Sequence, residues 1–203
     1  METDATFSPD LVEEMESTFN AFLPNDLRRL ASVHFTPSDK IILAAKWFEA
    51  AGVERVLDLG AGVGKFCVLA ALNSPGVHYT GVEQRPSLWR LSETLSQTYK
   101  VANAQFILGN ILDTDFKPFN GFYLFNPFYE QIAEEEGLTD EVAFDAQQHE
   151  LYQAYTLQQF KQMPVGTVVI AYHGEQHEIP YTYELQKQSP DGLLKMWVKK
   201  WIV

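Results

Sequence analysis

The sequence predicts an α/β fold, with a doubly wound, mainly parallel sheet that ends in a C-terminal antiparallel hairpin. Three observations predict it. From residue 55 onward, short apolar runs typical of buried strands alternate with longer amphipathic stretches typical of helices. The first apolar run leads directly into a glycine-rich loop. The last two runs, at about 180–188 and 193–202, are joined by a Ser-Pro-Asp-Gly segment, which favours a hairpin turn.

Length and composition limit the classes of protein that the chain can belong to. Its 203 residues, 46% hydrophobic and 21% charged, fit one globular domain with an additional element. The 27 acidic and 15 basic residues give a net charge of −12, which argues against broad binding to nucleic acid, because such binding needs Lys and Arg. The single cysteine excludes an internal disulfide and a Cys-rich zinc site. The acidic start lacks the apolar core of a signal peptide, and no apolar run approaches the roughly 18 residues of a membrane span, so we expect a cytoplasmic protein.

Two helices are expected before the sheet. Residues 8–23 carry apolar side chains at helical spacing, with Ser8 as the expected cap and Pro24 as the expected stop. The second helix is expected to begin near Ser38 and to end at Gly52.

Five strands and three helices are then expected in alternation. The strands are predicted at 55–59, 77–83, 104–108, 121–125 and 165–172, and the helices at 63–73, 86–100 and 140–162. Strands that alternate with helices form a parallel sheet with helices on both faces, and ligands of such sheets bind beyond the carboxyl ends of the strands. The candidate functional residues are therefore those that follow the strands.

The central motif is the loop Asp58-Leu59-Gly60-Ala61-Gly62-Val63-Gly64-Lys65, which follows the first strand and opens a helix. Glycines let the backbone turn tightly and let a ligand approach it, and a helix N-terminus offers unpaired N–H groups. A phosphate-binding P-loop is excluded twice, because Leu59 takes the place of its first glycine and Phe66 the place of its Ser or Thr. A dinucleotide fold needs G-x-G-x-x-G, but the third glycine comes one residue early here. Asp58 would also repel a pyrophosphate, whereas it would attract a ligand with an ammonium group.

This loop resembles the first motif of the class I S-adenosylmethionine-dependent methyltransferases, an acidic-x-G-x-G-x-G pattern. Asp58, Gly60, Gly62 and Gly64 match that pattern in full. The resemblance covers about residues 35–175. It implies a seven-stranded, Rossmann-like fold and S-adenosylmethionine as the cofactor.

Further matches follow at later strand ends. The resemblance implies that Glu83, at the end of the second strand, accepts both ribose hydroxyls of the cofactor. It implies that Asn110 meets the adenine edge and that Ile111 packs on the ring. In many relatives an aromatic or hydroxyl residue at the place of Phe35-Thr36 closes over the cofactor. The implied cofactor-binding residues are Phe35, Thr36, Asp58, Gly60, Ala61, Gly62, Gly64, Glu83, Gln84, Asn110, Ile111 and Asn126.

The candidate catalytic residues follow the fourth and fifth strands. Asn126-Pro127-Phe128-Tyr129 is similar to the Asn/Asp-Pro-Pro-Tyr/Phe signature of methyltransferases that act on planar nitrogens, but Phe128 replaces the second proline. The segment also resembles a bacterial group related to the DOT1-like lysine methyltransferases. We expect Asn126 and Tyr129 to aim the acceptor and His173 to accept its proton. His173 and His177 have metal-ligand spacing, but no third ligand stands out, so no metal is expected.

The sequence thus predicts an enzyme that transfers a methyl group from S-adenosylmethionine to a small molecule or a protein nitrogen. Residues 1–40 are expected to form a helical lid or extension, and residues 41–203 the methyltransferase domain. Two alternatives stay open: a non-catalytic module that keeps the cofactor pocket as a sensor or scaffold, and a different dinucleotide enzyme. The acceptor and the oligomeric state are left open by the sequence.

Overall fold

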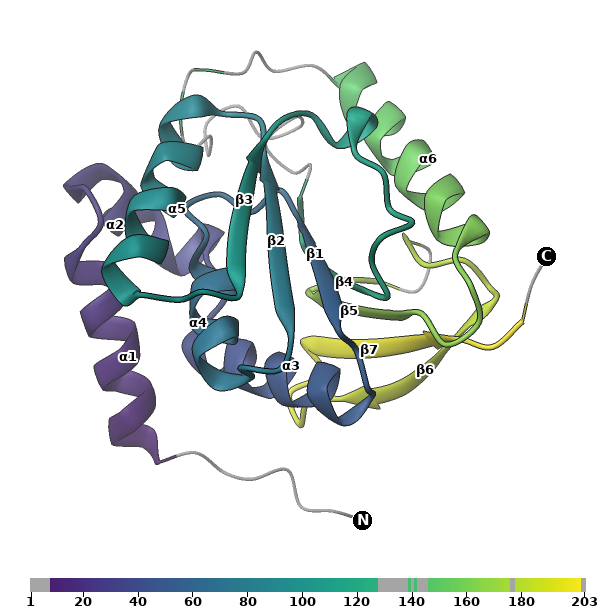
Figure 1. The fold of residues 1–203 in the computed structure, drawn as a ribbon, viewed down its shortest axis with the longest axis horizontal. Helices are drawn as coiled ribbons and strands as arrows, with labels where there is room; N and C mark the ends of the chain where they lie inside the picture. Colours follow the sequence, from purple (N-terminus) through teal and green to yellow (C-terminus); the bar gives the residue numbers. More distant parts are fainter. Residues whose placement is uncertain (1–7, 128–138, 140, 142–145, 176–177, 202–203) are drawn as a thin grey trace.

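A mixed seven-stranded sheet forms the centre of the computed structural model, which describes residues 8–127, 139, 141, 146–175 and 178–201 (Figure 1). The strands are β1 (Arg55–Leu59), β2 (His78–Glu83), β3 (Ala104–Leu108), β4 (Gly121–Phe125), β5 (Val168–Tyr172), β6 (Tyr183–Gln188) and β7 (Leu194–Lys199). Their order is β3-β2-β1-β4-β5-β7-β6. Strands β1 to β5 are parallel, and β7 runs antiparallel to both β5 and β6. The predicted fold class is confirmed.

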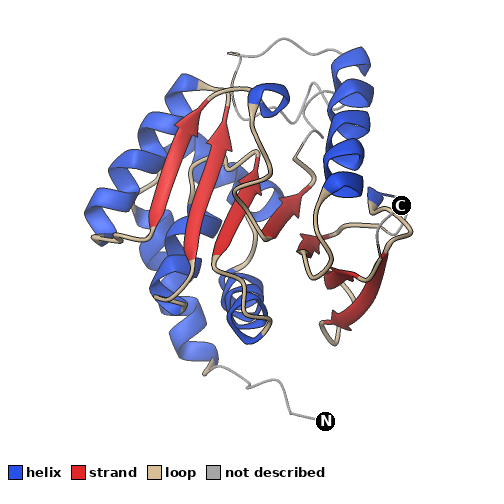
Figure 2. Ribbon diagram, turned by 45° about the vertical axis from the view of Figure 1, so that its right-hand side comes forward, coloured by secondary structure: helices blue, strands red, loops and turns tan. Residues whose placement is uncertain are grey.

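Helices cover both faces of the sheet (Figures 1 and 2). They are α1 (Pro9–Ala21), α2 (Asn25–His34), α3 (Ser38–Ala50), α4 (Lys65–Asn73), α5 (Pro86–Tyr99) and α6 (Ala146–Gln162), with a 3-10 turn, η1 (Ile111–Asp113), before β4. One core lies between the sheet and α3, α4 and α5, with Phe48 and Phe66 among its members. The other lies on the opposite face, where Phe122 and Trp197 pack against Phe160 of α6.

Helix α2 is the one described α-helix that the sequence did not predict. Pro24 was expected to stop the first helix, but that helix ends at Ala21 and Pro24 instead precedes α2 as its N-cap residue. Only Leu27 and Ala31 of α2 are buried, and two apolar residues make too weak a periodic signal. The expected side-chain cap at Ser8 is also wrong, because its carbonyl rather than its hydroxyl accepts the N–H groups of the first turn.

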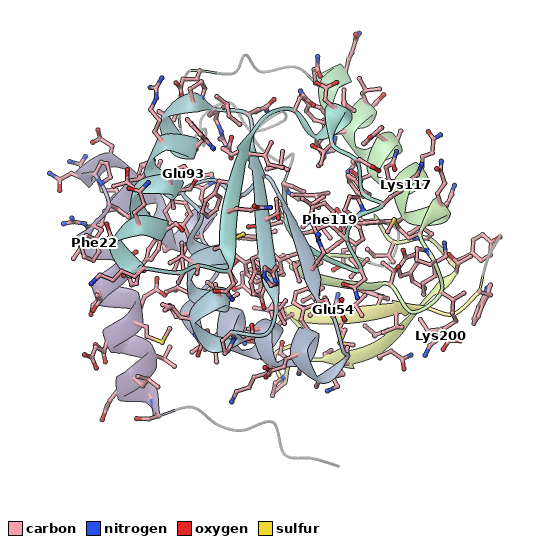
Figure 3. The ribbon with its side chains drawn as sticks, in the orientation of Figure 1. Phe22, Glu54, Glu93, Lys117, Phe119 and Lys200 are labelled. Carbon is pink, nitrogen blue, oxygen red and sulfur yellow. The ribbon has the colours of Figure 1, made fainter. Side chains whose placement is uncertain are left out.

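Contacts between side chains attach the N-terminal helices to the rest of the molecule. Arg28 of α2 donates three hydrogen bonds of 2.9–3.1 Å, to the carbonyls of Asn20 and Ala21 at the end of α1 and of Leu23 just after it. The rings of Phe19 and Phe22 lie 6.0 and 5.7 Å from the ring of Tyr99, at the end of α5. Figure 3 shows Phe22 where α1 and α2 approach α5. The two helices therefore pack beside α5, on one side of the sheet.

The C-terminal hairpin is joined to α6 by a buried lysine. The Lys199 side chain is fully buried, and its Nζ donates to the carbonyls of Phe160 (3.1 Å) and Lys161 (2.7 Å), near the C-terminus of α6. A cation at this end of a helix is favourable. The turn between β6 and β7 lies beside the carboxyl end of β5, because the His173 N–H donates to the Leu193 carbonyl at 2.8 Å.

Candidate active site

The glycine loop lies at the carboxyl edge of the sheet, where β1, β2 and β3 end together (Figure 2). Gly60, Gly62 and Gly64 all have positive φ angles, of 75°, 56° and 78°, which side chains with a Cβ rarely adopt. A Cβ on Gly64 would lie 2.6 Å from the Phe106 ring, and one on Gly60 would lie 3.1 Å from the Pro127 carbonyl oxygen. The loop therefore needs glycine for its backbone shape and for close packing.

Glu83 binds the glycine loop directly. Its side chain is 1% exposed, and its Oε2 accepts the backbone N–H of Gly62 at 2.8 Å. Arg85 supplies the other donors: its backbone N–H and Nε bond to Oε1 at 2.9 and 2.7 Å, and its Nη2 bonds to Oε2 at 3.0 Å. Glu83 and Arg85 thus form a buried, two-pronged ion pair, with both carboxylate oxygens engaged.

Three polar side chains form a second cluster beside Glu83. The Asn110 amide donates to the Tyr152 hydroxyl at 2.8 Å and to the side-chain oxygen Oε1 of Gln84 at 3.3 Å. The Tyr152 hydroxyl also donates to Gln84 Oε1, at 3.3 Å. The Asn110 oxygen accepts the backbone N–H of Leu112 and so caps η1. The cluster joins residues from the ends of β2 and β3 to helix α6.

A small cavity lies between the two clusters. It has a volume of about 30 Å³. The residues that line it are Gly60, Val82, Glu83, Gln84, Arg85, Gly109, Ile111, Pro127 and Tyr152. Ligand pockets usually measure about 300–1,000 Å³, so the side chains around this cavity have to move before it can accept a nucleoside.

Asp58 is a buried carboxyl group behind the glycine loop. It is 4% exposed, and its Oδ2 accepts a hydrogen bond from the Cys67 thiol at 3.4 Å. Burial raises the pKa of Asp58 to about 7, the Cys67 hydrogen bond opposes this, and the charge of Glu83 adds to it. Burial and the Asp58 charge raise the pKa of Cys67 well above its usual value. A cation placed near Asp58 would favour its ionised form.

Phe35 and Thr36 approach the loop from the end of α2. The Phe35 ring lies 4.0 Å from the position that a Cβ on Gly62 would take. Thr36 is buried, and its hydroxyl shares a 2.7 Å hydrogen bond with the hydroxyl of Tyr123 on β4. The Tyr123 ring stacks on Phe66 with 3.5 Å between the ring centres. Burial raises the pKa of Tyr123 well above its usual value, so this phenol stays protonated.

An ion pair fixes α1 to the far end of the glycine loop. Lys65, the residue after Gly64, is 2% exposed and donates to Glu16 of α1 at 2.6 Å. The other Glu16 oxygen accepts the backbone N–H and the hydroxyl of Ser38, at 3.1 and 2.6 Å. Burial alone would raise the pKa of Glu16, but the hydrogen bonds from Lys65 and Ser38 lower it overall. One carboxylate therefore links α1, the start of α3 and the start of α4.

The ends of β4 and β5 carry the other candidates. Asn126 and His173 are exposed and have positive φ angles of 41° and 59°, an uncommon backbone conformation that is concentrated at functional sites. Phe125 pairs with Tyr172 in the sheet, and their ring centres lie 5.9 and 4.4 Å from the His173 ring. Tyr129 and His177 lie outside the described residues.

The structure brings Gly60, Glu83, Gln84, Asn110 and Ile111 together. It places Asn126 and His173 directly after the neighbouring strands β4 and β5. Two polar residues that line the cavity, Arg85 and Tyr152, were not among the predicted site residues. Arg85 follows Glu83 by two positions, so a basic residue beside the carboxylate was a signal in the sequence. Tyr152 lies 42 positions after its partner Asn110, and nothing local indicated that α6 would place it there. Among the described residues, no group of three or more His, Cys, Asp or Glu side chains could hold a metal ion.

The comparisons with known proteins agree with this arrangement. A family model described as "Methyltransferase domain" matches residues 52–127, from before β1 to just after β4. This match and the fold support the prediction of a class I S-adenosylmethionine-dependent methyltransferase. No curated protein sequence matches it.

The chain is similar to solved structures over most of its length. An O-methyltransferase from Bacillus cereus, in complex with S-adenosylhomocysteine, has a TM-score of 0.60 at 13% identity, covering 97% of this chain and 94% of that one. An RNA methyltransferase from Salinibacter ruber, also in complex with S-adenosylhomocysteine, has a TM-score of 0.55 at 19% identity, covering 83% of this chain and 95% of that one. At such identities the likeness shows the fold alone.

The match to a methyltransferase domain supports the prediction of S-adenosylmethionine as the cofactor. The residues present fit this group in chemistry. The loop glycines leave no room for a Cβ against Pro127 and Phe106, and a buried carboxylate stands at the end of β2. In the described part of the chain, no helix has the length and apolar character to cross a membrane.

Proposed function

We propose that this methyltransferase transfers a methyl group to a nitrogen atom of a small molecule or of a protein. The observation that supports the proposal most is the convergence of the carboxyl ends of β1, β2 and β3 on one cavity, with a glycine backbone, a carboxylate and an amide around it. The cofactor supplies an electrophilic methyl group on a positively charged sulfur with a neutral leaving group. The chain's own residues therefore mainly have to position two reactants.

Each candidate cofactor residue has a proposed role. Asp58 and the loop from Gly60 to Gly64 orient the methionyl part, because the buried carboxylate favours a nearby ammonium group. Glu83 accepts the ribose hydroxyls. Asn110, Gln84 and Ile111 bind the adenine through amide groups and an apolar side chain beside the same cavity.

The acceptor is proposed to bind beyond β4 and β5. Asn126 offers an amide to a planar nitrogen group, and Tyr129 an aromatic ring. His173 is exposed beside two aromatic rings and accepts the proton when the acceptor has to lose one. The net charge of −12 favours a neutral or cationic acceptor over a nucleic acid. Membership of the DOT1-like group stays a prediction that rests on the sequence.

We further propose that residues 1–40 form a helical segment that closes the methionyl side of the pocket, and residues 41–203 the catalytic domain. The ion pair between Glu16 and Lys65 supports this division, because it attaches α1 directly behind the glycine loop. The position of Phe35 also supports it, since this residue precedes the catalytic domain and its ring lies 4.0 Å from the place that a Cβ on Gly62 would take.

Calorimetric titration with S-adenosylmethionine and S-adenosylhomocysteine tests the cofactor site. We expect micromolar binding of both, and a loss of at least tenfold in affinity for Asp58→Ala and Glu83→Ala. Glu184→Ala changes an exposed carboxylate on β6 and is the matched control, with unchanged binding. No binding to the wild-type protein would contradict the proposed roles of these residues.

Radioactive methyl transfer to panels of amines, basic peptides and phenols tests the acceptor class. We expect transfer to a nitrogen acceptor, with a lower kcat for His173→Ala and little change in the affinity for the cofactor. Transfer to phenols alone would favour an oxygen acceptor, as in the O-methyltransferase from Bacillus cereus. Binding of the cofactor without transfer to any acceptor would favour a sensor or scaffold.

A further inference from the structure

The carboxylate of Glu83 has no capacity left for a ligand. A carboxylate has about four lone-pair positions for hydrogen bonds. Glu83 accepts four bonds in the structure: from the backbone N–H groups of Gly62 and Arg85, and from Nε and Nη2 of the Arg85 side chain. Two ribose hydroxyls can therefore bind Glu83 only if two of the present donors leave.

The four donors are not equally easy to remove. The Gly62 N–H belongs to the glycine loop, whose shape is fixed by packing against Phe106 and Pro127. The Arg85 N–H belongs to the backbone at the start of α5, where Arg85 is the N-cap residue. The two guanidinium donors are at the end of a long, rotatable side chain. Only these can leave without a rearrangement of the main chain.

The small size of the cavity also indicates that Arg85 has to move before a nucleoside can bind. Glu83 and Arg85 both line the cavity of about 30 Å³, which is far smaller than a nucleoside needs. Arg85 is 7% exposed, so its guanidinium fills space beside the carboxylate instead of extending into water. Its movement would free both the volume and the hydrogen-bonding capacity that a ribose requires.

We propose that Arg85 is an internal counter-ion of the cofactor site, which neutralises Glu83 in the ligand-free protein and is displaced by the ribose diol of the cofactor. The exchange balances in hydrogen bonds, because two N–H donors leave and two O–H donors arrive. Breaking the ion pair opposes binding, so Arg85 lowers the affinity for the cofactor while it stabilises the ligand-free protein. This inference rests on the proposed role of Glu83.

The test compares S-adenosylhomocysteine binding by calorimetry in the wild type, Arg85→Met and Arg85→Lys. We expect the methionine variant to bind at least fivefold more tightly and to have a lower Tm without ligand, because Glu83 is then buried without its partner. The lysine variant keeps the charge but loses the two-pronged geometry, so we expect an intermediate affinity. Arg90→Met, an exposed arginine on the same helix, is the control with unchanged affinity.

Weaker or unchanged binding in Arg85→Met would overturn the proposal, because Arg85 would then stay in place and orient Glu83. A second measurement tests the proposal even if the Arg85→Met variant fails to fold. It follows the NMR signal of the Arg85 Nε–H in the wild-type protein. On addition of S-adenosylhomocysteine we expect it to move toward the position of a solvent-exposed arginine. A signal that stays in place at saturation would also overturn the proposal. If the wild type binds no S-adenosylhomocysteine at all, the proposed cofactor role of Glu83 fails first.

Discussion

Substitution of Asp58 by Asn should make the ligand-free protein more stable at high pH than the wild type. Asp58 is 4% exposed, and burial raises its pKa to about 7 from an unfolded value of 3.8. Between these two values the folded protein holds a proton that the unfolded chain has lost, so the stability of the wild type falls as the pH rises. An amide of the same shape cannot ionise and avoids this penalty.

The two pKa values give the magnitude. At pH 5 the folded carboxyl is nearly all protonated, whereas at pH 8 it is mostly ionised and buried. Integrating the proton difference between these pH values gives a loss of about 2–3 kcal/mol for the wild type relative to Asp58→Asn. For a chain of this size, that corresponds to a relative change in Tm of roughly 5–10 °C.

The assay is urea unfolding of both proteins without ligand at pH 5 and pH 8. The quantity of interest is the difference in unfolding free energy between variant and wild type, since other titrating groups cancel in it. Asp191→Asn is the control, because hydrogen bonds from Lys40, Ser189 and the Leu193 N–H outweigh slight burial and lower the pKa of Asp191 to about 2. The ionised Asp191 contributes its full stabilisation at pH values above its unfolded pKa of 3.8. The difference in unfolding free energy between Asp191→Asn and the wild type should therefore be constant between pH 5 and pH 8. A difference for Asp58→Asn that does not change with pH would refute the reasoning.

Three further substitutions test the packing and the site. Gly64→Ala should lower the free energy of unfolding, measured in urea, by roughly 2–4 kcal/mol, because the new Cβ would lie 2.6 Å from the Phe106 ring. Gly192→Ala is the control, since Gly192 has a similar φ but open space around it, and it should cost about 1 kcal/mol. Equal costs for the two substitutions would contradict this reasoning. Lys199→Met should lower the unfolding free energy by about 1–3 kcal/mol, because the Lys161 carbonyl loses the lysine donor and the Phe160 carbonyl keeps only its bonds from Tyr183 and Met163. An unchanged urea midpoint would count against this. Tyr152→Phe removes the hydroxyl that orients the Asn110 amide. Calorimetry should therefore show that S-adenosylhomocysteine binds the variant about threefold to tenfold more weakly. Unchanged binding would show that the orientation of the amide is unimportant for cofactor binding.

The order of strands and helices was predictable because each buried element carries its own periodic signal. The runs at 104–108 and 121–125 match β3 and β4 residue for residue. Helix α2 gave no such signal, because it buries only Leu27 and Ala31. The Arg28 side chain, rather than a wide apolar face, attaches it to the end of α1. An element that depends on a few specific contacts cannot be found from periodicity.

The site was predictable to the extent that strand ends determine position. In a parallel sheet, residues that follow neighbouring strands must lie at one edge, which is why Glu83 and Asn110 were found without knowledge of any contact. The partners of these groups come from elsewhere. Tyr152 reaches Asn110 from α6, and Glu16 reaches Lys65 from α1, through contacts that only the packing of distant helices creates.

These partners change what the site residues can do. Read from the sequence, Glu83 and Asn110 are a free acceptor and a free amide ready for a ligand. In the folded protein both are buried or partly buried, and such polar groups are costly to leave without hydrogen bonds. The ligand-free protein therefore satisfies them internally, with Arg85 and Tyr152. Cofactor binding then becomes an exchange of hydrogen bonds, and its affinity depends on the partners that leave as well as on the groups that bind. Affinity should accordingly respond to substitutions at residues, such as Arg85, that need make no contact with the bound cofactor.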